Sequence, residues 1–140
     1  MLNQGIPIFR LPRDIITKEI DQILDYGIKI HYEQEIKSYK EIEELAKKYD
    51  AVVLALGTLK PNKINQEFTT SNDIEDGLNF LLRVNEYNDK YIGKDVVVIG
   101  GGYTSMDCAR TALRLGAKSV RTFYRRTTDD LVILPGELLS

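Results

Sequence analysis

The spacing of hydrophobic residues changes several times along this chain, and each spacing predicts an element. Apolar residues recur every three to four positions in four stretches that we expect to be helices: 14–26, 38–49, 72–85 and 103–116. Capping boxes are expected at the starts of two of them, from Ser38 with Glu41 and from Asn72 with Glu75. Residues 28–32 alternate apolar and polar side chains, as a strand with one buried face would. Continuous apolar runs at 50–57 and 96–99 predict strands buried on both faces, and a further strand is expected at 119–124. Strands alternating with helices predict an α/β fold with a parallel sheet.

A glycine turn joins the strand expected at 96–99 to the helix that follows it. Gly100 allows a tight turn, and Gly102 has no Cβ, so a phosphate can approach the backbone. Ser105 is small enough for the helix to pack closely on the sheet. The helix N-terminus adds unpaired N–H groups and a positive dipole end. We therefore expect a Rossmann-like unit that binds the pyrophosphate of a dinucleotide at Gly100, Gly101, Gly102, Tyr103, Thr104 and Ser105.

The end of the next strand bears on the choice of dinucleotide. A site that prefers NAD carries an acidic residue about 20 positions beyond the glycines, where it bonds the ribose 2′-hydroxyl. Here the chain reads Phe123-Tyr124-Arg125-Arg126, and two guanidinium groups could hold a 2′-phosphate. The simpler reading of the two arginines is a solvated strand end. Because the strand, the glycine turn and the helix precede them in this order, the two arginines favour NADP.

Composition narrows the function classes. The formal net charge of −2 gives no broad attraction to nucleic acid or to an anionic membrane. With no apolar run near 18 residues and no signal-peptide pattern, we expect a cytoplasmic protein. The only cysteine, Cys108, cannot form an internal disulfide or a Cys-x-x-Cys redox pair. The only histidine, His31, lies on the polar phase of its stretch, so we expect a surface residue and no metal site.

Two stretches carry a family resemblance. Residues 5–12, Gly-Ile-Pro-Ile-Phe-Arg-Leu-Pro, would by themselves indicate only a turning lead-in to a helix. Together with residues 96–117 and Tyr124-Arg125-Arg126, they resemble the small subunit of NADPH-dependent glutamate synthase and its relatives, which include the flavin-binding reductase portion of dihydropyrimidine dehydrogenase. Two departures are visible: Tyr103 stands where that family usually has Asn, and Ser105 where it usually has Ala.

The resemblance implies part of a flavoprotein with two dinucleotide-binding domains, each a three-layer FAD- or NAD(P)-binding fold. Residues 1–88 would be a partial FAD-binding domain, and residues 89–140 the N-terminal half of the NAD(P)-binding domain. Gly57 and Thr58 would end a strand that passes beneath the flavin, where a side chain at Gly57 would collide with it. NADPH would pass a hydride to FAD, and electrons would move on to an iron–sulfur or amidotransferase partner such as a glutamate synthase large subunit. Because this is cofactor chemistry, no catalytic side chain is expected.

Relatives also carry features that this chain lacks, among them a first glycine fingerprint upstream of Gly5 and a Gly-Asp motif near the C-terminus. We therefore expect an internal section of a larger reductase, with an unpaired sheet edge and uncovered apolar faces. Such a chain would be unstable alone, form a homodimer or depend on the rest of its polypeptide.

There are two other candidate functions, of which only the first remains a real alternative. A truncated NADP-binding module without turnover would lack bound flavin. An ordinary short-chain or 2-hydroxy-acid dehydrogenase is disfavoured, because a long α/β section precedes the glycines and no Tyr-x-x-x-Lys pair follows them.

Overall fold

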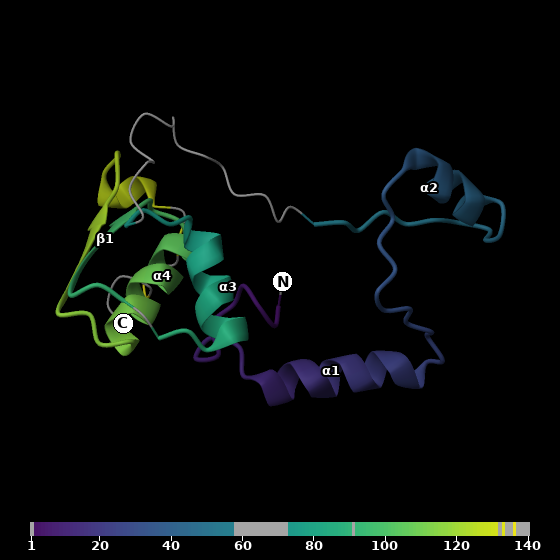
Figure 1. The fold of residues 1–140 in the computed structure, drawn as a ribbon, viewed down its shortest axis with the longest axis horizontal. Helices are drawn as coiled ribbons and strands as arrows, with labels where there is room; N and C mark the ends of the chain where they lie inside the picture. The colour runs from purple at the N-terminus through teal and green to yellow at the C-terminus, as the bar shows by residue number, and fades with distance from the viewer. Residues whose placement is uncertain (1, 58–72, 91, 132, 134–135, 137–140) are drawn as a thin grey trace. The chain divides into compact units, whose positions relative to one another are not determined.

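The computed structural model describes residues 2–57, 73–90, 92–131, 133 and 136. Its elements, shown in Figure 1, are α1 (Arg13–Asp25), α2 (Tyr39–Ala46), α3 (Gly77–Tyr87), β1 (Asp95–Ile99), α4 (Tyr103–Arg114), β2 (Ser119–Phe123) and the 3-10 turn η2 (Thr128–Asp130). The chain forms two compact units, one of residues 1–17 with 60–140 and the other of residues 18–59. No helix in the described ranges is long and apolar enough to cross a bilayer.

The larger unit is built on a parallel pair of strands. Strands β1 and β2 pair in register from Asp95 with Ser119 to Ile99 with Phe123, and α4 connects them. Helix α4 packs on the sheet and α3 packs on α4, as Figure 1 shows. The core consists of the buried residues Phe80, Leu81, Cys108 and Ala112, against which Val84, Ile92, Val96, Val98, Leu115, Ala117 and Val120 pack. The α/β class, the parallel sheet and the strand–turn–helix–strand unit are therefore confirmed.

The two faces of the sheet differ sharply in exposure. Val96 and Val98 are partly buried against α4, whereas Val97 and Ile99 are 58% and 71% exposed. Phe123 of β2 is 57% exposed. The prediction that β1 is buried on both faces is thus wrong for the part of the chain that the structure describes, because α4 covers one face and leaves these side chains on the other. This result agrees with the expectation of uncovered apolar faces.

The N-terminal stretch is part of the same unit and not a simple lead-in. Pro7 is fully buried, and the amide Nδ2 of Asn85 donates a hydrogen bond to the carbonyl of Gln4 at 2.8 Å. The Arg10 guanidinium pairs with the Asp107 carboxylate at 3.2 Å, where the aspartate side chain is only 8% exposed. A long-range, partly buried ion pair therefore fastens this stretch to α4.

A second contact extends that attachment along α4. The Arg114 guanidinium lies 3.8 Å from the centroid of the Phe9 ring, which is cation–π geometry. Residues 9 and 10 thus contact α4 near its middle, at Asp107, and at its C-terminal end, at Arg114.

The smaller unit keeps the predicted helices but not the predicted strands. Ser38 begins α2 with the expected capping box: the Glu41 N–H donates to Ser38 Oγ at 3.4 Å, and the Ser38 N–H donates to Glu41 Oε2 at 2.9 Å. The backbone N–H groups of Lys37 and Ser38 lower the pKa of the Glu41 carboxyl. His31 is exposed, as predicted.

Residues 28–32 and 50–57 form no strand in the structure, so both of those predictions are wrong. A buried parallel strand needs hydrogen-bonded neighbours and helices over its faces, and the described residues of this unit provide neither. Val53, Leu54 and Leu56 are accordingly 87%, 59% and 76% exposed.

Helix α3 begins differently from the prediction. Its N-cap is Asp76, which makes no side-chain capping bond, while Asn72 lies outside the described residues. Glu75, the expected partner in a capping box, instead pairs with Arg83 at 2.9 Å. The division into domains at residues 88 and 89 stays a prediction, since the compact units follow packing and not domain ancestry.

Replacing Arg10 tests the attachment of the N-terminal stretch. Arg10→Ala removes an ion-pair partner from a carboxylate that is almost buried, so we expect a loss of about 1–3 kcal/mol in the free energy of unfolding. Denaturant titration followed by circular dichroism measures it, and Arg121→Ala on the exposed part of β2 is the matched control. Equal midpoints for the two variants would show that the ion pair contributes nothing.

Candidate nucleotide site

The three glycines after β1 have three different surroundings. Gly100 has a φ of +140°, and a Cβ there would collide with Ser105 Oγ. A Cβ on Gly101 would lie 2.5 Å from the ring of Tyr124. A Cβ on Gly102 would meet no atom within 4 Å. The first two glycines are therefore required by packing, whereas the third leaves open space at the mouth of α4.

The first turn of α4 borders that open space. Gly102 is the N-cap, and its carbonyl accepts hydrogen bonds from the N–H groups of Ser105 and Met106 at 3.0 and 3.2 Å. The N–H groups of Tyr103 and Thr104 precede the first helical acceptor, and the N-cap has no side chain to bond them. These N–H groups point out of the helix along its axis, at the positive end of the helix dipole. This arrangement suits the binding of an anion.

The two predicted arginines lie at the same edge of the sheet as the glycines. Parallel strands β1 and β2 end together, and the Gly100 N–H donates to the Phe123 carbonyl at 2.9 Å. Arg125 and Arg126 follow two and three positions later, and both side chains are exposed. The structure thus brings the glycine turn and the arginines to one edge, as predicted.

The segment after the arginines is folded against the turn, which sequence reasoning missed. The ring of Tyr124 and the side chain of Leu131 both lie too close to Gly101 for a Cβ there. The Tyr124 hydroxyl donates to the carbonyl of Asp130 at 3.1 Å. Asp130 Oδ2 accepts from the Thr127 N–H at 3.3 Å and from its hydroxyl at 2.9 Å. The Thr-x-x-Asp spacing was a readable signal for this capping box.

Tyr103, the main departure from the family pattern, lies beside a residue from the other end of the chain. The Arg10 guanidinium is 5.3 Å from the centroid of its ring, and Tyr103 remains 42% exposed. No local pattern could have predicted a contact between residues so far apart in sequence.

Cys108 is not a candidate nucleophile. Its thiol is buried and donates to the Gly77 carbonyl at 3.4 Å. Burial raises its pKa to about 12, and the negative charges of Asp107 and Glu75 add to the shift. A thiol that stays protonated in the core is inert, so its role is packing.

The predicted flavin contacts are only partly described. Gly57 belongs to the smaller unit, is exposed, and has a φ of +69° that favours glycine for backbone reasons alone. Thr58 lies outside the described residues. Their place beside a flavin stays a prediction.

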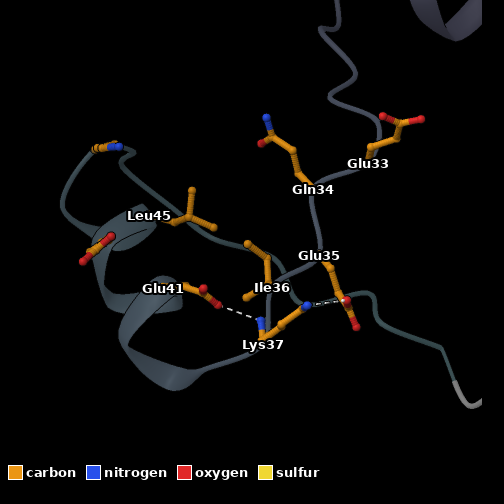
Figure 2. A pocket seen from close by; sticks show the side chains of 9 residues that line it. Glu33, Gln34, Glu35, Ile36, Lys37, Glu41 and Leu45 are labelled. Atoms are coloured by element: carbon orange, nitrogen blue, oxygen red, sulfur yellow. Dashed lines mark hydrogen bonds and ion pairs between the residues drawn. The ribbon is translucent and has the colours of Figure 1, made fainter.

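A surface hollow in the smaller unit contains none of the predicted site residues. Figure 2 shows it beside the α2 cap, with Glu41 bonded to the Lys37 backbone and an ion pair of 3.2 Å from Lys37 to Glu35. Its lining is mostly exposed and charged: Glu33, Gln34, Glu35, Ile36, Lys37, Glu41, Glu44, Leu45 and Lys48. Such a surface is well solvated, and no group of acids, Cys and His in the described ranges has a metal-binding arrangement.

Comparison with known proteins gives consistent results. Residues 7–129 match the family model described as pyridine nucleotide-disulphide oxidoreductase. The chain is 36% identical over 134 residues to the NADPH-Fe(3+) oxidoreductase subunit beta of Geobacter sulfurreducens, which covers 94% of the chain and 20% of that subunit. It is 34% identical to the glutamate synthase [NADPH] small chain of Azospirillum brasilense, with 90% and 29% covered.

A third relative carries a different nucleotide in its name. The chain is 38% identical to the glutamate synthase [NADH] of Schizosaccharomyces pombe, with 86% of the chain and 6% of that enzyme covered. The chain therefore spans less than a third of each of these three relatives.

The different surroundings of Gly100 and Gly102 predict different costs of the same substitution. Gly100→Ala should lower the free energy of unfolding by about 1–3 kcal/mol, because it combines an unfavourable φ with a collision at Ser105. Gly102→Ala should lower it by only about 0.5–1 kcal/mol, because the backbone there is extended and the space is open, so that only the N-cap preference for glycine over alanine is lost. Chemical denaturation of both variants measures the difference. Equal losses would contradict the assigned surroundings.

Proposed function

The chain belongs to the pyridine nucleotide-disulphide oxidoreductase family, and from that premise we propose that it is part of an NADPH-dependent flavin oxidoreductase. NADPH binds at the mouth of α4 and passes a hydride to FAD, and electrons then move on to an iron–sulfur or amidotransferase partner. A cytoplasmic location remains a prediction from the sequence. The catalytic cycle belongs to the whole protein, since the matched region is a minor part of each relative's length.

The observation that carries the proposal is the shared edge of β1 and β2. At this edge an open space beside Gly102 meets the first N–H groups of α4, which have no side-chain cap within the described residues, and the exposed Arg125 and Arg126. A pyrophosphate on the helix N-terminus would place the adenosine ribose toward the end of the second strand, as in other dinucleotide folds. We assign the pyrophosphate contacts to residues 100–105 and the 2′-phosphate contacts to Arg125 and Arg126.

The choice of NADPH over NADH depends on those two arginines. A carboxylate at the end of β2 would bond a ribose 2′-hydroxyl and repel a 2′-phosphate, but Tyr124, Arg125 and Arg126 occupy the positions that follow the strand. Two relatives are named for NADPH and one for NADH, so family membership alone does not select the nucleotide. The local charge favours NADPH.

The family supports the use of a bound flavin, and the names of the relatives support the presence of a partner subunit. A nicotinamide donor needs an acceptor, and members of this family use a bound flavin, which supplies the hydride-accepting chemistry. Two of the relatives are named as a subunit beta and a small chain, which supports a partner subunit for this chain. The protein's task is to align the two rings, so we name no catalytic side chain.

A second candidate is an NADP-binding module without turnover. It is favoured by the segment 50–57, which was predicted to pass beneath the flavin and forms no strand here. An absorbance spectrum of the purified chain separates the two functions: flavin bands near those of bound FAD support the reductase, and a colourless chain that binds NADPH supports the module.

Removing the arginines tests the nucleotide assignment. Two charge-assisted bonds to a 2′-phosphate contribute about 1.5–3 kcal/mol, so Arg125→Ala with Arg126→Ala should weaken NADPH binding roughly ten- to a hundredfold. NADH binding should not change. Calorimetric titration of each nucleotide measures both, with Arg121→Ala as a control for the loss of a positive charge on the preceding strand, β2. Equal weakening of NADPH and NADH would contradict the assignment.

The Gly102 variant tests the pyrophosphate contact separately. Gly102→Ala is expected to fold normally, but its methyl group occupies the space that a phosphate needs, so both NADPH and NADH should bind at least about tenfold more weakly. Gly93→Ala, at the opposite end of β1, is the control. Unchanged affinity in the Gly102 variant would place the pyrophosphate elsewhere.

A further inference from the structure

We propose that Asp130 is a positioning residue that determines nucleotide preference by holding Arg125 and Arg126 at the glycine turn. The inference rests on the proposed function, because it concerns how the same site recognises a 2′-phosphate. Asp130 itself does not contact the nucleotide in this proposal. Its effect is transmitted through the folded segment of residues 124–131.

The first step is the way in which the segment is closed. Asp130 Oδ2 accepts hydrogen bonds from both the backbone N–H and the hydroxyl of Thr127, and the Asp130 carbonyl accepts from the Tyr124 hydroxyl. The Asp130 N–H in turn donates to the Thr127 carbonyl at 3.2 Å, and η2 fills the interval. Residues on both sides of the two arginines are therefore tied to one aspartate.

The second step is the place where the closed segment is anchored. Tyr124 precedes the arginines and Leu131 follows Asp130, and the two side chains meet over Gly101. Tyr124 and Leu131 are partly buried, whereas Arg125 and Arg126 project into solvent. The segment is thus fixed at its two ends on the glycine turn, and the exposed arginine side chains lie between those ends.

The third step is the effect of this arrangement on affinity. A long arginine side chain on a loose loop loses both loop and side-chain freedom when it binds a phosphate, whereas on a fixed loop it loses only the side-chain part. NADH has no 2′-phosphate and gains nothing from the arginines. The closed segment therefore increases the affinity for NADPH selectively.

The negative charge of Asp130 has the opposite effect on NADPH affinity from its positioning role, so the two effects predict changes in opposite directions. A carboxylate near a 2′-phosphate repels it, so removing a negative charge by itself should strengthen NADPH binding. Asp129 is the matched control, because it is the adjacent acid, lies in the same 3-10 turn and is exposed, and the structure shows no side-chain bond from it to Thr127 or Tyr124 within the described segment. The two aspartates differ in hydrogen bonding and not in charge.

The experiment compares Asp130→Ala, Asp130→Asn and Asp129→Ala in the full chain by calorimetric titration with NADPH and NADH. Because Asp130→Ala removes a capping interaction, we expect it to weaken NADPH binding roughly three- to tenfold and to leave the affinity for NADH unchanged. Asp129→Ala should leave NADPH binding equal or tighter. Asp130→Asn retains an acceptor oxygen for Thr127 and should recover most of the lost affinity.

A second measurement links the effect to the arginines. In a chain that already carries Arg125→Ala and Arg126→Ala, the Asp130→Ala change should have no further effect on NADPH affinity, because there is nothing left to position. An additive loss in that background, or an equal loss for NADH, would show a general structural role and overturn the proposal. Tighter NADPH binding by both aspartate variants would also overturn it, in favour of simple charge repulsion.

These outcomes are separable from the proposed function itself. If the unmodified chain shows no preference for NADPH, the proposed nucleotide site fails before Asp130 is considered. If the preference is present and depends on the arginines, but Asp130→Ala leaves the ratio of the two affinities unchanged, only the positioning role fails.

Discussion

The closeness of α4 to the end of β1 is the constraint on which the larger unit depends. At Gly100 the backbone passes so near Ser105 that no side chain fits between them, and at Gly101 the ring of Tyr124 closes the other side of the turn. Because the turn is fixed by contacts on two sides, the first N–H groups of α4 have a defined direction. The same contacts determine where the chain continues after β2. One tight junction therefore sets the position of both parts of the proposed nucleotide site.

Much of this junction could be predicted from the sequence, because its determinants are local. A β-branched run, three glycines and a small residue at Ser105 lie within ten positions, and the period of the apolar residues identifies β1 and α4 to within about a residue at their starts. The capping box at Ser38 was readable for the same reason, since an N-cap and its partner are three residues apart. Each of these features is complete within one turn of helix or one strand.

Features that depend on distant residues could not be predicted in this way. The run at 50–57 has the composition of a buried strand, but a strand exists only where another backbone pairs with it, and the described residues of its unit offer no such pairing. The exposure of Val97 and Ile99 also depends on what covers the sheet and not on their own identity. Arg10 and Asp107 both lie in stretches that the resemblance singled out, but nothing in either stretch indicated that the two residues would pair. At the site, the arginines were predicted, whereas the aspartate that closes their loop was not.

The separation of Arg10 from Asp107 has a consequence for how the protein is made. The two residues are 97 positions apart, and a ribosome that adds about 5–20 residues per second would need roughly 5–20 s to pass from one to the other. Strands β1 and β2, by contrast, are joined by a single helix and can pair soon after both have emerged. During the intervening seconds Phe9 and Arg10 have been synthesised without the helix that later packs on them. The attachment of residues 9 and 10 to α4 therefore forms only after Asp107 and Arg114 have been synthesised.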